Sequence, residues 1–254
     1  MFSQEGMLRM REGGFDVTSD ETTALFAQLV EEGVLTEADS VFWELLTPQR
    51  ARRLVEVLKR RTRYITVVLE AVDDGHNQAA VLRSADAFGV QEVSIVEGRA
   101  SFSPSEGVSK GAHKWLTIRK HPDIHAAVRF LREQGYRIWA SRLDDNAVPL
   151  EAVDLSQPAA FLFGNEHAGL SEEALALADG SFIVPMVGFV QSLNISVAAA
   201  ITLYTVTRRA REVAGDRYPL TTEEQRAVLQ TWLRTATPKT RRVAQELARQ
   251  ATEG

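Results

Sequence analysis

Short apolar runs rich in β-branched and aromatic residues alternate with helical patterns along most of this chain. We expect strands at residues 64–70, 92–96, 114–121, 136–141, 159–164 and 181–185. The residues between these runs, such as 79–88 and 122–134, have the apolar spacing of helices. Parallel strands are joined through helices and buried on both faces, so they are apolar along their whole length. The alternation therefore predicts an α/β fold, with a parallel sheet and helices on both of its faces.

Helical patterns without strands flank this region on both sides. Residues 21–46 predict two short helices separated at Gly33, and residues 221–233 and 238–250 predict two more. We therefore expect three parts in the chain. They are an acidic, mostly helical extension at 1–47, an α/β domain with a basic leading helix at 48–211, and a helical extension at 212–254.

The composition is that of a soluble globular protein, with 44% hydrophobic and 25% charged residues. Because the chain has no cysteine, disulfide frameworks, thiolate zinc sites, iron–sulfur clusters and cysteine nucleophiles are excluded. The N-terminal residues carry charges where an export signal needs an apolar segment. The most apolar stretch, 195–206, is shorter than the roughly 20 residues of a membrane span. We expect a cytoplasmic protein that does not enter a membrane.

Charge is distributed unevenly. Residues 1–47 hold ten acidic residues and two arginines, a net charge of −8, within a chain whose net charge is −5. Residues 50–63 hold seven cations and the single acid Glu56. The apolar positions Leu54 and Leu58 lie on one helical stripe, which places the cations toward solvent. This segment is either an ordinary solvated helix or a surface that binds phosphates.

Several common active-site motifs are absent. The chain has no glycine-rich dinucleotide fingerprint, no phosphate-binding loop of the G-x-x-x-x-G-K type, and no G-x-S-x-G nucleophile turn. His121 and His125 are four residues apart, but no third ligand is near them in the sequence, so we expect no metal site. A nicotinamide oxidoreductase, a P-loop nucleotide hydrolase and a serine hydrolase of the α/β type are therefore not supported.

The helix expected at residues 76–89 carries an arginine on its outer side. Val81 and Phe88 lie on its core stripe, and Arg83 is about 200° away from Val81 around the helix. Arg83 is either a solvated surface side chain or a group that reaches a ligand or a neighbouring subunit. Asn77, near the start of the helix, offers an amide for hydrogen bonding.

A glycine and two polar residues follow the apolar run at 159–164. Gly164 permits a close backbone approach, and Asn165 and Glu166 come directly after it. Ligands of parallel α/β sheets bind outside the carboxyl ends of the strands, where these residues are expected. An ordinary strand-to-helix loop is the alternative.

The segment 182–204 contains a strand, a glycine-containing loop and a helix that is apolar on nearly every side. Residues 192–194, Ser-Leu-Asn, open the helix, and alanines occupy 198–200. A helix that is apolar all round must be buried. We expect part of it to lie in a subunit interface.

Three motifs in these segments resemble one enzyme family. They are N-x-x-A-x-x-R with the continuation A-D-A-x-G-V at 77–90, L-F-G-x-E-x-x-G-L-S at 162–171, and I-x-P-M-x-G-x-x-Q-S-L-N-I-S-V-A at 183–198. Over about residues 50–211 the chain resembles the SpoU/TrmH group of SPOUT-superfamily RNA ribose 2′-O-methyltransferases. The resemblance implies a deep trefoil knot in the C-terminal part of the sheet, a homodimer whose active site is completed across the interface, and S-adenosylmethionine as methyl donor.

The resemblance also implies which residues bind and react. The expected cofactor contacts, several of them through main-chain atoms, are Ser141, Gly164, Val184, Met186 and Leu193. The expected catalytic residues are Asn77, Arg83, Glu166, Ser192 and Asn194. An arginine is a poor base because its pKa is above about 12. We therefore expect Arg83 of the other subunit to hold an RNA phosphate and orient the 2′-hydroxyl, whose proton goes to a phosphate oxygen or to a perturbed guanidinium.

Within the family, residues 111–115 and 125–131 most resemble the enzymes that methylate guanosine-18 of tRNA. The expected RNA-binding residues are Arg52, Arg53, Lys59, Arg60, Arg61, Arg63 and Lys114. The alternatives are the same reaction on ribosomal RNA and a non-catalytic RNA-binding protein of the same fold. The acidic residues 1–47 have no counterpart that we can place, and are either a shield that tunes the RNA surface or a packing appendage.

Overall fold

The computed structural model describes residues 19–99, 101–143 and 146–253. The acidic residues Glu5, Glu12 and Asp16 of the N-terminal extension lie outside the described residues. Contacts within the chain divide it into two compact units, one formed by Met1–Leu58 with Thr221–Gly254 and the other by Lys59–Leu220. The expected division at 47 and 211 differs from this one, because the basic leading helix belongs to the same unit as the terminal helices.

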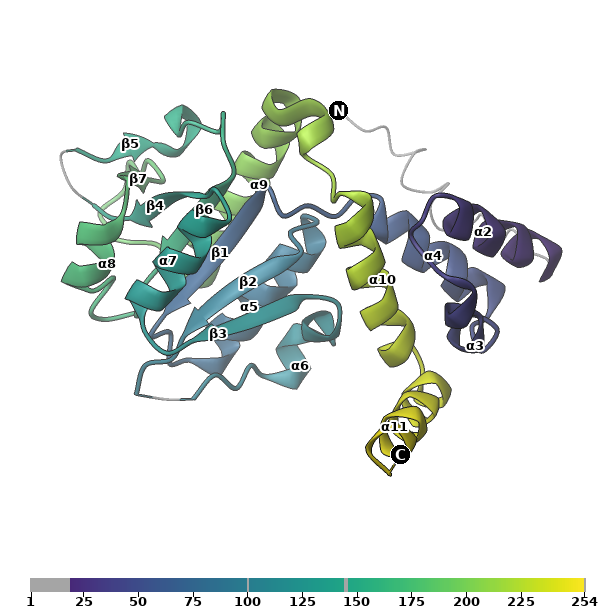
Figure 1. The fold of residues 1–254 in the computed structure, drawn as a ribbon. Helices are drawn as coiled ribbons and strands as arrows, with labels where there is room; N and C mark the ends of the chain where they lie inside the picture. The colour runs from purple at the N-terminus through teal and green to yellow at the C-terminus, as the bar shows by residue number, and fades with distance from the viewer. Residues whose placement is uncertain (1–18, 100, 144–145, 254) are drawn as a thin grey trace. The chain divides into compact units, whose positions relative to one another are not determined.

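The unit Lys59–Leu220 is built on a seven-stranded sheet (Figure 1). Its strands are β1 (Ile65–Glu70), β2 (Glu92–Val96), β3 (Thr117–His121), β4 (Arg137–Ser141), β5 (Val148–Pro149), β6 (Ala159–Phe163) and β7 (Gly180–Ile183). The strand order is β3-β2-β1-β6-β4-β7-β5, and every neighbouring pair is parallel. The predicted parallel α/β sheet is confirmed. The two-residue strand β5 at the sheet edge was not predicted.

Helices cover both faces of this sheet. They are α5 (Gly75–Ala87), α6 (Glu106–Ser109), α7 (Ile124–Glu133), α8 (Glu172–Leu177) and α9 (Ile195–Ala214), with three short 3-10 turns, η2 (Ala112–Lys114), η3 (Leu150–Ala152) and η4 (Gly215–Arg217). Side chains of α5 and α9 share one core with Val67 of β1, and side chains of α7 and α8 share the other core with Val68. Successive residues of a strand point to opposite faces, so one buried strand supplies both cores.

The strand ends bring three loops to one edge of the sheet. Strands β6, β4 and β7 are neighbours, and all of them run in the same direction. The residues that follow them therefore meet at the carboxyl edge, where parallel sheets bind ligands. Helices α5, α8 and α9 begin at this edge with the side-chain caps Asp74, Ser171 and Asn194.

The other unit is helical. Its elements are α2 (Ser19–Glu31), η1 (Glu37–Asp39), α3 (Ser40–Trp43), α4 (Pro48–Leu58), α10 (Thr222–Thr235) and α11 (Pro238–Glu253). Leu29 of α2, Trp43 of α3 and Trp232 of α10 are buried, as are Leu54 and Leu58 of α4. Residues from both ends of the chain thus supply the apolar side chains of this unit.

Among the described helices, none combines the length and the hydropathy that crossing a membrane would require.

Candidate active site at the carboxyl edge of the sheet

Three polar side chains from three elements form a hydrogen-bonded chain at the carboxyl edge. The amide nitrogen of Asn194 donates to Oδ1 of Asn77 at 3.2 Å, and the amide nitrogen of Asn77 donates to Oε1 of Glu166 at 3.0 Å. Asn77 lies in the first turn of α5 and is 8% exposed, Glu166 follows β6, and Asn194 precedes α9. The structure thus brings together three of the five expected catalytic residues.

The cap of α9 orients this chain of amides. Oδ1 of Asn194 accepts hydrogen bonds from the backbone nitrogen of Ser196 at 2.8 Å and from its hydroxyl at 2.5 Å. Its amide nitrogen is left to donate toward Asn77. An asparagine used as an N-cap is held in one orientation by the helix that it opens. Asn194 therefore donates to Asn77, and Asn77 in turn donates to the carboxylate of Glu166.

The first turn of α5 is held in the same way. The carboxylate of Asp74 accepts from the backbone nitrogen of His76 at 2.7 Å, and this hydrogen bond lowers the pKa of Asp74 below its ordinary value. Gln78 is buried, donates to the carbonyl of Val72 at 2.7 Å and accepts from the backbone nitrogen of Ser103 at 3.0 Å. The sequence did not single out Gln78. Its signal was a polar residue on the inner side of a helix that also carries Asn77.

The loop after β6 is closed on itself. Asn165 and Gly169 exchange two backbone hydrogen bonds of 2.9 Å, and the Asn165 amide donates to the carbonyl of Ala71 at 2.8 Å. A Cβ atom on Gly164 would lie 2.2 Å from the carbonyl carbon of Gly169. The close approach that Gly164 permits is therefore to the chain's own backbone, and not only to a ligand as the sequence suggested.

A buried carboxylate anchors the far end of this loop. Glu70, at the end of β1, accepts from the hydroxyl of Ser171 at 2.7 Å and from its backbone nitrogen at 2.9 Å. The Ser171 hydroxyl also accepts from the backbone nitrogen of Ala174 and so caps α8. The loop that presents Glu166 is thus fixed at both ends.

Arg83 and Ser192 stand outside the hydrogen-bonded chain. Arg83 is exposed on α5 and has no hydrogen-bond or ion-pair partner among the described residues, as its helical position predicted. Ser192 is exposed in the segment between β7 and α9. One copy of the chain therefore does not by itself bring all five expected catalytic side chains into contact.

The five expected cofactor residues are all partly buried and lie at or after the ends of strands. Ser141 ends β4, Gly164 follows β6, and Val184, Met186 and Leu193 lie between β7 and α9. All five are partly buried. They belong to the ends of neighbouring strands, so they surround one stretch of the carboxyl edge.

An apolar surface adjoins this edge. Val187, Phe189 and Val190 are exposed after β7, and Val197 and Tyr204 are exposed on α9. Exposed apolar side chains that are contiguous mark an interaction surface.

The expected RNA-binding residues separate into two groups. Arg52, Arg53, Lys59, Arg60 and Lys114 are exposed. Arg61 is a correction, because its side chain is only 1% exposed. It donates to the carbonyls of Val90 at 3.2 Å and Asp86 at 3.3 Å, and forms an ion pair with the Asp86 carboxylate. Helix α4 ends at Leu58, so the helical spacing that placed Arg61 toward solvent does not extend to it.

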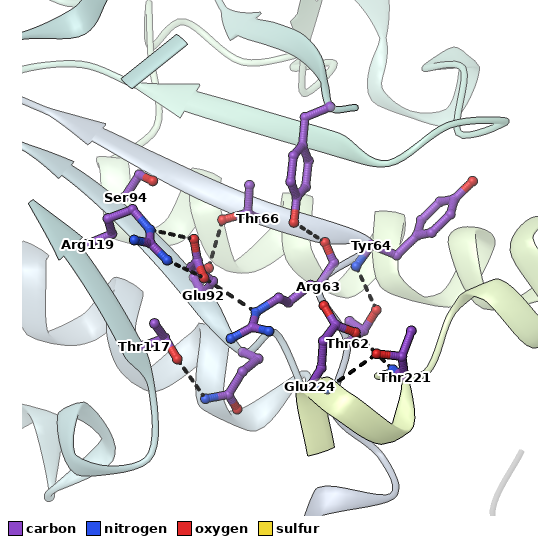
Figure 2. Close-up of polar contacts among 12 residues, drawn as sticks. Thr62, Arg63, Tyr64, Thr66, Glu92, Ser94, Thr117, Arg119, Thr221 and Glu224 are labelled. Atoms are coloured by element: carbon purple, nitrogen blue, oxygen red, sulfur yellow. Dashed lines mark hydrogen bonds and ion pairs between the residues drawn. The ribbon is translucent and has the colours of Figure 1, made fainter. Parts of the chain in front are cut away.

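Arg63 also has a fixed partner. Its Nε lies 3.3 Å from the carboxylate of buried Glu92, and Arg119 binds the same carboxylate from the other side at 3.0 Å (Figure 2). Thr66 donates to the Glu92 carbonyl at 2.7 Å, and the Tyr136 hydroxyl donates to the Arg63 carbonyl. With 25% of its side chain exposed, Arg63 serves this cluster rather than an open RNA surface.

Within the described residues, no group of three or more histidine, aspartate and glutamate side chains could hold a metal ion.

Comparison with known proteins decides the family. Residues 64–204, which include all three motifs, match the SpoU rRNA Methylase family. The chain belongs to the SpoU family.

Two relatives of this SpoU protein are named tRNA (guanosine(18)-2'-O)-methyltransferase. The one from Thermus thermophilus is 47% identical over 190 residues, which cover 74% of this chain and 97% of the relative. The one from Escherichia coli K12 is 42% identical over 67% of this chain and 74% of the relative.

Solved structures agree with the fold of this SpoU protein. The structure described as the A. aeolicus TrmH/SpoU tRNA modifying enzyme matches with a TM-score of 0.67 and 34% identity, over 74% of this chain and 97% of that one. An AdoMet-bound rRNA methyltransferase from Sinorhizobium meliloti matches with a TM-score of 0.53 and 27% identity, over 61% and 60% of the two chains. The resemblance inferred from the three motifs is confirmed.

Proposed function

We propose that this chain methylates the ribose 2′-hydroxyl of guanosine-18 in the D-loop of tRNA, with S-adenosylmethionine as the methyl donor. The observation that carries the proposal is the hydrogen-bonded chain of Asn194, Asn77 and Glu166. It lies in a protein that is 47% identical to a Thermus enzyme named for this reaction, over 97% of that enzyme.

The residues at the carboxyl edge suit the cofactor. The partly buried Ser141, Gly164 and Leu193 offer main-chain donors and acceptors beside the apolar side chains of Val184 and Met186, which matches a ligand with a polar nucleoside and an aliphatic arm. When bound, S-adenosylmethionine supplies an electrophilic methyl group on a sulfonium sulfur. A relative of known structure is described as AdoMet-bound.

The topology supports a trefoil knot in this part of the chain. Strand β7 follows β6 in sequence, yet β4 lies between them in the sheet. The chain must therefore pass β4 before it enters β7 and then turn through residues 184–194 into α9. We assign the knot to these loops, with the cofactor residues on its inner side.

The protein's own groups have separate tasks in this proposal. The Asn77 and Asn194 amides and Glu166 form a polar wall whose side chains are already held in place by hydrogen bonds to one another, so little reorganisation is needed when RNA binds. Arg83 holds an RNA phosphate through two N–H groups and orients the 2′-hydroxyl. Ser192 hydrogen-bonds the hydroxyl or Arg83. As the 2′-oxygen bonds to the methyl group, the bond from sulfur to that methyl breaks and the cofactor leaves as a neutral thioether. The hydroxyl proton passes to a phosphate oxygen of the RNA, or to Arg83 if its side chain has first lost a proton to become the neutral guanidine, because a guanidinium cannot accept a further proton.

A second copy of the chain completes this site. Arg83 has no partner among the described residues of its own copy, and the segment that carries Ser192 adjoins exposed Phe189 and Val190. Two copies that bury the apolar surface of this segment and α9 would bring Arg83 of one to the edge of the other. The exposed Arg52 and Arg53 of the helical unit bind RNA phosphates, and so do the exposed Lys59, Arg60 and Lys114 of the unit Lys59–Leu220.

The test is methylation of an unmodified tRNA transcript with radiolabelled S-adenosylmethionine, followed by nuclease mapping of the label. We expect label on the ribose of guanosine-18. Arg83→Ala should lower turnover at least about 100-fold and leave cofactor binding unchanged, because it removes positioning in the transition state. Arg129→Ala is the matched control, since Arg129 is an exposed arginine on α7, over the opposite face of the sheet.

Other outcomes would overturn parts of the proposal. Label that appears only in ribosomal RNA would assign another substrate. RNA binding without any label would indicate a non-catalytic protein of the same fold. Normal turnover in Arg83→Ala would remove Arg83 from the reaction.

A further inference from the structure

Helix α2 is an integral part of the helical unit. The rings of Phe26 and Trp43 lie 5.7 Å apart, and the Trp43 indole nitrogen donates to the carbonyl of Thr22 at 3.2 Å. Leu29 is buried, and the carbonyl of Gly33 accepts from Arg226 of α10 at 2.7 Å. These contacts hold α2 against α3 and α4, so its outer surface is presented in a fixed place.

Helix α2 contacts α4, which carries Arg52 and Arg53 of the proposed RNA-binding residues. Both are exposed, and so is a third arginine of this helix, Arg50. Residues 19–47, in contrast, contain seven acidic residues and no lysine or arginine. One of the seven, Asp39, is buried and accepts from Thr36 and Gln230, and the other six are exposed.

One ion pair joins the two helices. The Glu21 carboxylate of α2 lies 3.7 Å from the Arg52 guanidinium of α4, and both side chains are about half exposed, at 55% and 44%. Arg53 pairs within its own helix, with Glu56 at 3.6 Å. Arg50 has no ion pair among the described residues. The three arginines of α4 therefore differ in their ion pairs: Arg52 pairs with another helix, Arg53 pairs within its own helix, and Arg50 has no ion pair among the described residues.

We propose that Glu21 competes with RNA phosphates for Arg52, so that α2 sets how tightly α4 holds RNA. This inference rests on the proposed function, in which α4 is part of the RNA surface. An exposed ion pair is weak, so a phosphate can displace it, but each displacement reduces the net affinity.

The competition predicts non-additive effects of two substitutions. In equilibrium binding of an unmodified tRNA transcript to the full chain, Glu21→Gln should tighten binding about two- to five-fold at low salt. It should also steepen the dependence of log K on log salt by about 0.9 if one further phosphate contact forms. Arg52→Ala should cost little in the native background and more in the Glu21→Gln background, because only there is Arg52 released from Glu21.

Two controls separate this inference from the stability of the fold and from the proposed function. Glu37→Gln removes an exposed acid that pairs with no cation among the described residues, and should leave RNA affinity unchanged. Arg50→Ala should weaken RNA binding equally in both backgrounds. Thermal melting of every variant checks that the helical unit remains folded.

The outcomes distinguish a failure of the competition between Glu21 and RNA from a failure of the proposed function. An equal cost of Arg52→Ala in both backgrounds, with Arg50→Ala still weakening binding, would overturn the competition and leave the proposed function intact. If Arg50→Ala, Arg52→Ala and Arg53→Ala all leave RNA affinity unchanged while guanosine-18 is methylated, α4 is not the RNA surface and the inference is overturned with it. If no tRNA is methylated, the proposed function itself fails.

Discussion

The two units of the chain differ in whether their charged side chains are buried or exposed. In the unit Lys59–Leu220, some charged side chains are buried with fixed partners, as Arg61 is with Asp86 and Glu92 is with two arginines. In the helical unit the core is apolar, around Leu29 and Trp232, and nearly all its charges are exposed. In the helical unit, helical spacing therefore predicts which side of a helix most charged side chains occupy, and buried Asp39 is an exception. In the α/β unit the partners that decide a charge's position lie far away in the sequence.

The largest effect should come from the apolar core of the helical unit. Trp232 is 2% exposed, and Trp232→Ala should lower the free energy of unfolding of this unit by about 3 to 5 kcal/mol, through lost burial and an internal cavity. Hydrogen exchange should show lost protection in α4 and α10 and unchanged protection in β1 and β6. Thr231→Ala, an exposed neighbour, is the control. Equal loss in both units would show that they unfold as one.

A buried charge should be nearly as important in the α/β unit. Arg61→Ala leaves the Asp86 carboxylate and the carbonyls of Asp86 and Val90 without their donor, and should cost about 3 kcal/mol in chemical denaturation. Arg60→Ala, at the exposed adjacent position, should change stability by less than about 0.5 kcal/mol. If the two substitutions cost the same, Arg61 is a surface residue after all.

A smaller effect is expected where the backbone comes closest to itself. Gly164→Ala places a Cβ atom 2.2 Å from the backbone of Gly169, so the loop that carries Glu166 must shift, at a cost of about 1 to 3 kcal/mol. Calorimetric titration should show weakened binding of S-adenosylmethionine. Gly107→Ala meets no atom within 4 Å, so it should neither destabilise the protein nor weaken cofactor binding. Unchanged cofactor affinity in Gly164→Ala would separate the loop from the cofactor site.

The smallest effect concerns the cap of α5. The pKa of Asp74 is lowered from 3.8, chiefly by the backbone hydrogen bond from His76, so its stabilising effect is present above that pH and is lost as the pH falls through the lowered pKa. Asn is an equally good cap but does not titrate. The melting temperature of the native protein should exceed that of Asp74→Asn near neutral pH, and the difference should shrink below about pH 4. A difference that does not vary with pH would show that the charge of Asp74 is not involved.

Much of the fold could be predicted because it rests on local patterns. Apolar runs located six of the seven strands, and helical spacing located α5, α7 and α10. The order of the strands could not be predicted from these patterns, since β4 lies between β6 and β7 through contacts distant in the sequence. The knot and the homodimer were expected only through the family resemblance.

The candidate site divides in the same way. Motif spacing identified Asn77, Glu166 and Asn194, but not that their amides and carboxylate form one chain of hydrogen bonds. That chain depends on three elements that are up to 117 positions apart. Gln78 and Glu70, which hold the same loops, could not be identified as site residues from their inner positions alone, because any buried polar residue on an inner face could satisfy a backbone group.

The sequence by itself determined the α/β class and the family, and it supplied the residues that we propose to react, because periodicity and short motifs record local geometry. Only the tertiary structure decided which charges are available. Arg61 and Arg52 lie in the same basic segment, yet Arg61 is buried against α5 and Arg52 faces Glu21 at the surface. The physical reason is that a charge is placed by the partners that replace its water, and those partners are brought near only when the chain has folded.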